Sequence, residues 1–191
     1  MSDQNTQSPP IIRAAAVLYT PETTAEFVLS NFADELKGQG LKVGGLVQEF
    51  LTDDEGGRIG LDAIEVDTGA RIPINRPTES DKINGVCSLD RSALTGSTSA
   101  LRRAISDKVD LIVVEKFGVQ ESKGGGLAND ILEVIATETP LLVAVPETSY
   151  EAWLERTGGL GGRLQFDEQS FHDWWAALAR LIDPVVVRCV A

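Results

Sequence analysis

The chain has 191 residues, of which 42% are hydrophobic and 24% charged, and its formal net charge at pH 7 is −12. These values fit one ordinary globular domain with a substantial core. So strong a negative charge argues against a nucleic-acid partner or an anionic membrane surface. No segment contains the roughly 18 consecutive apolar residues of a membrane span, so we expect no membrane partner.

The chain carries few of the residues that mark export or histidine chemistry. Its first ten residues, MSDQNTQSPP, lack the basic and apolar blocks of a signal peptide and are expected to form a disordered tail. Cys87 and Cys189 lie far apart in sequence, which indicates neither a disulfide framework nor a zinc site. A cytoplasmic protein is therefore expected. The single histidine, His172, is expected on a solvated helix face and excludes most histidine-based triads.

The first half of the chain begins with a strand–helix–strand pattern. A continuous apolar run over 11–19 is typical of a strand that is buried on both faces. Apolar residues recur at helical spacing over 25–36, and Gly38-Gln39-Gly40 ends that helix. A second strand is expected over 41–47. Together these elements predict a βαβ unit.

The next segment has the pattern of a β-hairpin. Residues 58–67 and 70–75 flank Thr68-Gly69, which is typical of a hairpin turn. Pro73 cannot donate a backbone hydrogen bond, so the second arm is expected to be an edge strand.

The second half returns to alternating elements. Asp90 is expected to cap a helix, and apolar runs at 110–115 and 140–146 are expected to be buried strands. The predicted order is a loop at 76–88, a helix at about 91–107, a strand at 110–115, a loop at 116–126, a helix containing 127–135, a strand at 140–146, a short helix from Ser149 that breaks at 158–162, and a last helix at about 168–182.

Strands that alternate with helices, together with one hairpin, predict an α/β fold. We expect three layers, with a mostly parallel sheet between helices on both faces, in a single domain over 11–183. The apolar tail at 184–191 is expected to add to a sheet edge, in its own subunit or in a neighbour. Trp174 and Trp175 are adjacent, so one should pack on the sheet and the other cover an edge or a partner. A homo-oligomer is therefore expected.

Ligands of such sheets bind beyond the carboxyl ends of the strands, and two segments lie there. The first is the turn Thr20–Thr24 after the first strand, where a phosphate loop needs glycines and a lysine. The turn instead contains Pro21, which has no N–H, and Glu22. Two like unit charges at 4 Å repel by about 1 kcal/mol in water and about 4 kcal/mol at a partly buried site. The sequence therefore predicts a degenerate Walker A loop that disfavours triphosphates.

The second segment is the loop at 116–126. Its Ser122-Lys123-Gly124-Gly125-Gly126 stretch precedes a helix, and it is either a flexible connector or an anion nest made of backbone N–H groups. A tetrahedral oxyanion such as molybdate, tungstate or phosphate needs only N–H groups, hydroxyls and one lysine. The predicted anion-binding residues are Thr20, Thr23, Thr24, Lys116, Ser122, Lys123, Gly124, Gly125 and Gly126.

Motifs over nearly the whole chain, about residues 12–178, resemble two related families. GGLVQ at 44–48, the hairpin segment at 56–74, DLIVVEKFG at 110–118 and PLLVAV at 140–145 resemble the small P-loop nucleoside-triphosphatases of thermophiles and vertebrates. Gly45-Leu46-Val47-Gln48, Cys87-Ser88-Leu89-Asp90 and Phe117-Gly118 are more similar to a bacterial family without settled function that is often encoded with molybdate transporters. The resemblance implies a P-loop-NTPase-like fold and a tie to molybdenum or tungsten handling.

The resemblance also identifies two acidic candidates for a metal site. The triphosphatases have an Asp-Glu pair after the fourth strand that holds Mg²⁺ and orients water, and this chain has Glu115-Lys116 instead. Glu115 is expected either to meet a metal or to form an ion pair at the strand end. Glu121 matches a second family acid, and loop solvation is its alternative. Cys87 is expected to be either a reactive thiol or a small buried residue.

The sequence thus predicts a cytoplasmic, non-hydrolytic binding protein for a small oxyanion, in molybdenum or tungsten homeostasis. One alternative is a residual Mg-dependent nucleoside triphosphatase that uses Glu115 or Glu121. Another is an oligomeric interaction module formed by the tryptophan helix and the apolar tail. No resident cofactor is expected; molybdate or tungstate would be the ligand, and only the triphosphatase would need Mg²⁺. A binding protein is expected rather than an enzyme. Because the triphosphatase is retained as an alternative, enzymatic activity stays an open question at this point.

Overall fold

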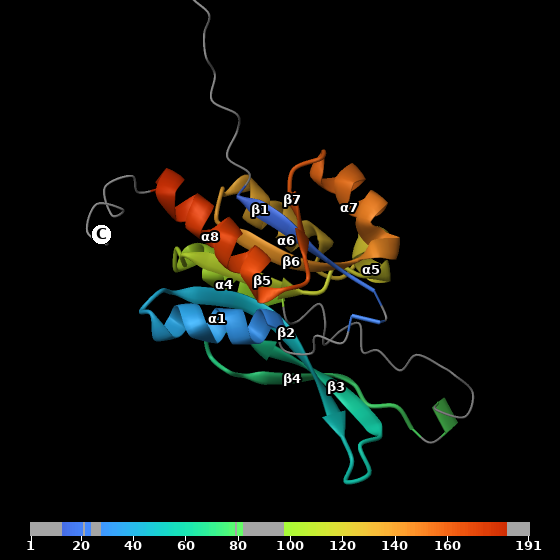
Figure 1. Cartoon of the computed structure of the whole chain (residues 1–191). Helices are drawn as coiled ribbons and strands as arrows, with labels where there is room; N and C mark the ends of the chain where they lie inside the picture. Colours follow the sequence, from blue (N-terminus) through green and yellow to red (C-terminus); the bar gives the residue numbers. More distant parts are fainter. Residues whose placement is uncertain (1–12, 21, 24–27, 79, 82–97, 183–191) are drawn as a thin grey trace, which may run out of the picture.

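A computed structural model describes residues 13–20, 22–23, 28–78, 80–81 and 98–182 (Figure 1). Its seven-stranded sheet has the order β4-β3-β2-β5-β6-β1-β7. The neighbours β2, β5, β6, β1 and β7 run parallel, whereas β3 and β4 extend the sheet antiparallel beside β2. The strands are β1 (Ala14–Tyr19), β2 (Val43–Thr52), β3 (Arg58–Glu65), β4 (Arg71–Asn75), β5 (Leu111–Glu115), β6 (Leu141–Pro146) and β7 (Gly162–Gln165).

Helices cover both faces of this sheet, so the predicted three-layer α/β fold is confirmed. One face packs on α1 and α8 through Leu29, Phe32 and Phe171, and the other packs on α4, α6 and α7 through Leu101, Ile131 and Trp153. The helices are α1 (Val28–Gly38), α4 (Thr98–Ser106), α5 (Val119–Ser122), α6 (Ala128–Ala136), the 3₁₀ turn η1 (Glu147–Ser149), α7 (Tyr150–Thr157) and α8 (Glu168–Ile182).

The central strands are apolar throughout because they are covered on both faces. The side chains of Leu111–Val114 in β5 are fully buried. β1 and β6 show the same burial up to their last residues. The amphipathic spacing that predicted a helix within 25–36 is confirmed by α1, which buries Leu29, Phe32, Ala33 and Leu36.

The antiparallel part of the sheet is larger than the sequence predicted. The expected hairpin is present as β3 and β4, and β4, which contains Pro73, is an edge strand as predicted. However, β2 continues to Thr52 and pairs antiparallel with β3, which makes a second hairpin. In Figure 1 the β2–β3 end projects away from the helices.

The other sheet edge differs from the expectation. β7 pairs parallel with β1, so this edge strand comes from the segment after the glycine-rich break at 158–161. The sequence predicted no strand there. Residues 1–10, 184–191, Asp90 and Cys87 lie outside the described residues, and so does the first part of the helix expected from about residue 91.

The aromatic helix α8 also differs from the simple expectation. Trp174 and Trp175 are both half-buried and both contact the apolar core between α8 and the sheet, with ring centroids 6.3 Å apart. His172 packs against the ring of Phe32 and places its Nε2 atom 3.2 Å from the Glu35 carboxylate. None of the described helices is long and apolar enough to cross a membrane.

Candidate functional site

The two segments singled out in the sequence lie at the same edge of the sheet. β1 ends at Tyr19 and β5 ends at Glu115, and both strands pair with β6, which lies between them. The loop after β5 stays at this edge because the N–H of Phe117 donates to the Ala144 carbonyl of β6 at 2.9 Å. The carboxyl ends of parallel strands are the usual binding edge of such a sheet.

The turn after β1 is closed by its own threonines. The hydroxyl oxygens of Thr20 and Thr23 lie 3.1 Å apart, and the Thr20 N–H donates to the Thr23 hydroxyl at 3.0 Å. The Glu22 N–H donates to the Thr20 hydroxyl, and the Thr23 N–H donates to the Thr20 carbonyl. The described part of the turn therefore offers one O–H donor to a ligand, because the two hydroxyls share one hydrogen bond and the N–H groups already have partners. Pro21 and Thr24 lie outside the described residues.

Glu115 forms the acidic part of this edge. Its half-buried carboxylate accepts a hydrogen bond from the Gln48 N–H at 3.2 Å, which links the end of β5 to β2. Burial, together with the charge of Glu115, raises the pKa of Tyr19 to about 12. The Tyr19 phenol is therefore neutral at ordinary pH and stands near a negative charge.

The Tyr19 pKa gives a test of this arrangement. A folded-state pKa of about 12 exceeds the unfolded value of about 10, so the free energy of unfolding should fall as pH rises from about 10 to about 12. Glu115→Gln should lower the Tyr19 pKa without restoring it to 10, because burial is the larger cause. Absorbance titration of tyrosinate in a Tyr150→Phe background, which leaves Tyr19 alone, measures this. An unchanged titration would contradict the proximity of Tyr19 and Glu115.

Glu121, the second predicted metal ligand, is a buried carboxylate that backbone N–H groups hold in place. Only 4% of this residue is exposed, and its two carboxylate oxygens accept hydrogen bonds from the N–H groups of Gly118 at 2.9 Å and Leu127 at 3.2 Å. A buried charge is stabilised by such donors. The carboxylate thus holds together the segment that runs from the end of β5 through α5 to the start of α6.

The glycine-rich stretch after α5 is a shaped structural loop. The N–H groups of Lys123, Gly124 and Gly125 donate to the backbone carbonyls of Gln120 and Glu121. A Cβ atom at Gly126, which has φ +53°, would lie 2.1 Å from Glu121 Oε1. These contacts give no support to the expected anion nest, because three of its N–H groups are already used.

The same stretch is also held from α7. The Arg156 Nε donates to the Ser122 carbonyl at 3.0 Å, and a Cβ atom at Gly124 would lie 3.0 Å from the same guanidinium. The Ser122 hydroxyl donates to the Gly118 carbonyl at 2.9 Å. Of the two alternatives that the sequence left open, the connector is therefore closer to the structure than the anion nest. The connector is, however, ordered by specific contacts.

Lys116 and Lys123 are both exposed, and neither forms an ion pair with any other residue in the described ranges. Lys116 immediately follows β5, and its aliphatic stem lies beside Gly118. It is therefore an available positive charge at the same edge as the Thr20 hydroxyl. Among the described residues, no group of three or more His, Cys, Asp and Glu side chains is arranged to hold a metal ion.

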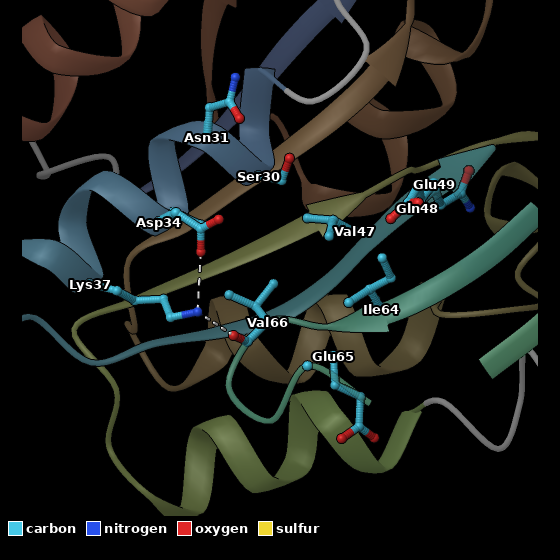
Figure 2. Close-up of a pocket in the computed structure, with 12 residues that line it drawn as sticks. Ser30, Asn31, Asp34, Lys37, Val47, Gln48, Glu49, Ile64, Glu65 and Val66 are labelled. Carbon is cyan, nitrogen blue, oxygen red and sulfur yellow. Dashed lines mark hydrogen bonds and ion pairs between the residues drawn. The ribbon is translucent and has the colours of Figure 1, made fainter. Parts of the chain in front are cut away.

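A groove that sequence reasoning missed opens next to this edge, between α1 and the β2–β3 strands (Figure 2). Its cavity volume is about 370 Å³, with Val47, Ile64 and Val66 on the sheet side. Lys37 of α1 closes its lower end, because its Nζ donates to Asp34 Oδ1 at 3.2 Å and to the Val66 carbonyl at 3.0 Å.

The polar rim of the groove joins it to the strand ends. Ser30 and Asn31 line it from α1, and Gln48 lines it from β2, where the Gln48 N–H reaches Glu115. Glu65 turns its carboxylate to the other side, toward α4, where Arg103 Nη2 donates to it at 2.6 Å. No motif could have revealed this groove, because one helix and two separate strands build it.

The fold and the strand-end position of these residues define a class, the α/β proteins with a P-loop-NTPase-like sheet. The DUF2478 family, described as "Protein of unknown function", matches residues 14–174, and the chain belongs to this family. No solved structure matches the chain.

Three curated relatives agree with this class. The chain is 37% identical over 185 residues to the molybdenum import ATP-binding protein ModC 2 of Bradyrhizobium diazoefficiens, covering 93% of this chain but 20% of ModC 2. It is 31% identical over 121 residues to the nucleoside-triphosphatase THEP1 of Pyrococcus abyssi, covering 60% of this chain and 64% of that protein. THEP1 of Methanocaldococcus jannaschii is 26% identical over 127 residues, covering 66% and 71%. The chain thus spans about a fifth of ModC 2 and about two thirds of each THEP1.

Proposed function

We propose that the protein is a non-hydrolytic binding module for a small tetrahedral oxyanion and that it serves molybdenum or tungsten homeostasis. The observation that carries the proposal is the exposed Lys116 at the end of β5, which has no ion-pair partner among the described residues and shares an edge with the hydroxyls of Thr20 and Thr23. One cation and the O–H donor that this hydroxyl pair leaves over suit a small anion. The similarity to ModC 2, whose name refers to molybdenum import, supports the choice of anion.

The charges at this edge favour a small anion over a triphosphate. Glu22 is exposed in the turn after β1, and Glu115 stands at the end of β5. At 4 Å a phosphate charge is repelled by about 1 kcal/mol at a site in water, such as that of exposed Glu22, and by about 4 kcal/mol at a partly buried site, such as that of Glu115. A triphosphate long enough to span the edge would meet both carboxylates, whereas a single tetrahedral anion between Lys116 and Thr20 would meet Glu115 alone.

The anion proposal predicts a selective thermal shift. A ligand at 100 times its Kd adds about 2.7 kcal/mol to the free energy of unfolding, which corresponds to a rise in Tm of roughly 5–10 °C for a domain of this size. We expect this rise with molybdate or tungstate, and a smaller one or none with sulfate, phosphate, MgATP or MgGTP.

Two lysine variants locate the anion. Lys116→Ala should remove the molybdate-induced shift, whereas the matched control Lys42→Ala should keep it, because Lys42 is exposed at the opposite, amino-terminal end of the strands. A shift that survives in Lys116→Ala would place the anion elsewhere. A shift produced by nucleotides alone would contradict the proposal.

A residual Mg-dependent nucleoside triphosphatase is the second candidate function. The similarity to the two THEP1 proteins and the carboxylate of Glu115 at the end of β5 favour it. Carboxylates at this place in P-loop proteins hold Mg²⁺. Phosphate release from ATP or GTP that requires Mg²⁺ and disappears in Glu115→Gln would establish this activity and exclude a purely binding role.

A further inference from the structure

A second and larger groove lies at the amino-terminal edge of the sheet, opposite the proposed anion site. Its cavity volume is about 790 Å³. Its apolar lining comes from four parts of the chain. These are the segment before β2, the segment before β6, the end of α4 with the turn after it, and the second half of α8. The apolar lining residues are Leu41, Pro140, Ile105, Val109, Trp175 and Ala179. The other six lining residues are polar or charged, so the groove is an apolar floor with a polar rim, the pattern of many interaction sites.

The last described helix contributes to this groove. Trp175 and Ala179 are four residues apart in α8, so they lie on one face of the helix, and α8 ends three residues after Ala179, at Ile182. The next nine residues, DPVVVRCVA at 183–191, lie outside the described part of the structure. They contain four valines, and Pro184 prevents the helix from simply continuing.

We propose that residues 183–191 bind in this groove of the same chain and cover the amino-terminal edge of the sheet. The length of the segment is sufficient. The groove passes the residues just before β1, β6, β5 and β2, and the two outer strands of these four are three strand spacings apart, or about 14 Å. Nine extended residues reach about 30 Å.

The composition of the segment also fits the groove. Valine side chains match its apolar lining, and burial of such side chains is the usual driving force for docking. Arg188 is the single charged side chain beyond Asp183, and the groove lining contains two carboxylates together with the basic side chains of Arg13 and Lys108. The carboxylates are those of Glu138, with 75% of its side chain exposed, and Asp110. An arginine near either acid would form a charge-assisted hydrogen bond.

The test compares three aspartate substitutions in a Cys87→Ser background, which leaves Cys189 as the sole thiol. Val186→Asp alters the segment, and Ala179→Asp alters the groove. Val119→Asp is the matched control, because Val119 is 63% exposed on α5, far from the groove lining. The readouts are Tm, the rate at which a thiol reagent modifies Cys189, and the oligomeric mass at several concentrations.

We expect Val186→Asp and Ala179→Asp each to lower Tm by about 5 °C or more and to speed the modification of Cys189 at least tenfold. The Tm of the double variant should be hardly lower than that of either single variant, because the two substitutions break the same contact. Val119→Asp should change neither Tm nor the rate of Cys189 modification. Cys189 modification is measured well below the Tm of each variant, so that the rate reports on folded protein.

Three results would overturn the proposal. Cys189 that reacts as fast in the parent as in unfolded protein would show that the segment does not dock. If Cys189 is protected from the thiol reagent but the Tm losses of Val186→Asp and Ala179→Asp are additive, the segment binds elsewhere, such as at the edge of β7. Protection that is lost on dilution together with a dimeric mass would show that a second copy supplies the segment.

Discussion

Gly45→Ala is expected to abolish stable folding. Gly45 lies inside β2 with φ +122°, a conformation that side-chain-bearing residues rarely adopt. A Cβ atom there would lie 1.9 Å from the Val113 carbonyl oxygen and 2.8 Å from the Val113 nitrogen of β5. These are backbone atoms in the middle of the sheet, so no side-chain rotation relieves the clash, and β2 must separate from β5.

The expected loss for Gly45→Ala is more than about 4 kcal/mol in the free energy of unfolding, which is the range reached by severe backbone and core clashes. Soluble yield and urea unfolding measure it. Gly38→Ala is the matched control, because Gly38 ends α1 with nothing within 4 Å of its Cβ position. There alanine should be neutral or stabilising by up to about 1 kcal/mol. Equal stability of the two variants would contradict the close approach of β2 and β5.

Glu121→Gln is expected to have the second largest effect. The substitution keeps the shape of the side chain but replaces one acceptor oxygen with an NH₂ group. That group would face the N–H of Gly118 or of Leu127, each of which now donates to the carboxylate. A buried donor without an acceptor costs about 1–3 kcal/mol, and hydrogen bonds to charged groups are worth about 1.5–3 kcal/mol.

We therefore expect Glu121→Gln to lower the free energy of unfolding by about 2–4 kcal/mol and to loosen the loop between β5 and α6. Chemical unfolding gives the first quantity, and amide hydrogen exchange of Gly118 and Leu127 gives the second. Glu133→Gln, at an exposed position of α6, is the control and should be within about 0.5 kcal/mol of the parent. An unchanged stability in Glu121→Gln would remove the structural role and restore Glu121 as a candidate metal ligand.

The sequence predicted the elements whose periodicity is decided locally. β1, β5 and β6 are uninterrupted apolar runs, and α1 has a clean apolar stripe, so their existence and type followed directly. β7 has only four residues with alternating exposure and pairs on one side with β1. Such a short edge strand is stabilised by its neighbour rather than by its own composition, which is why the glycine pattern before it dominated the prediction.

The candidate site shows a similar division. The place of the two loops at one edge of the sheet followed from the strand pattern alone. The role of Gly124 and Gly126 could not be predicted from the sequence. An anion nest and a structural loop require the same residues and differ only in what surrounds them. Here the surroundings are Glu121 and the Arg156 guanidinium, which come from α5 and α7. Only the tertiary structure places them against the glycines.

Equilibrium dialysis against molybdate and against MgATP is the most direct test of the proposed function. The protein should retain molybdenum saturably, Lys116→Ala should lose that retention while Lys42→Ala keeps it, and ATP should be neither retained nor hydrolysed. Saturable retention of ATP with release of phosphate, and no retention of molybdenum, would contradict the account.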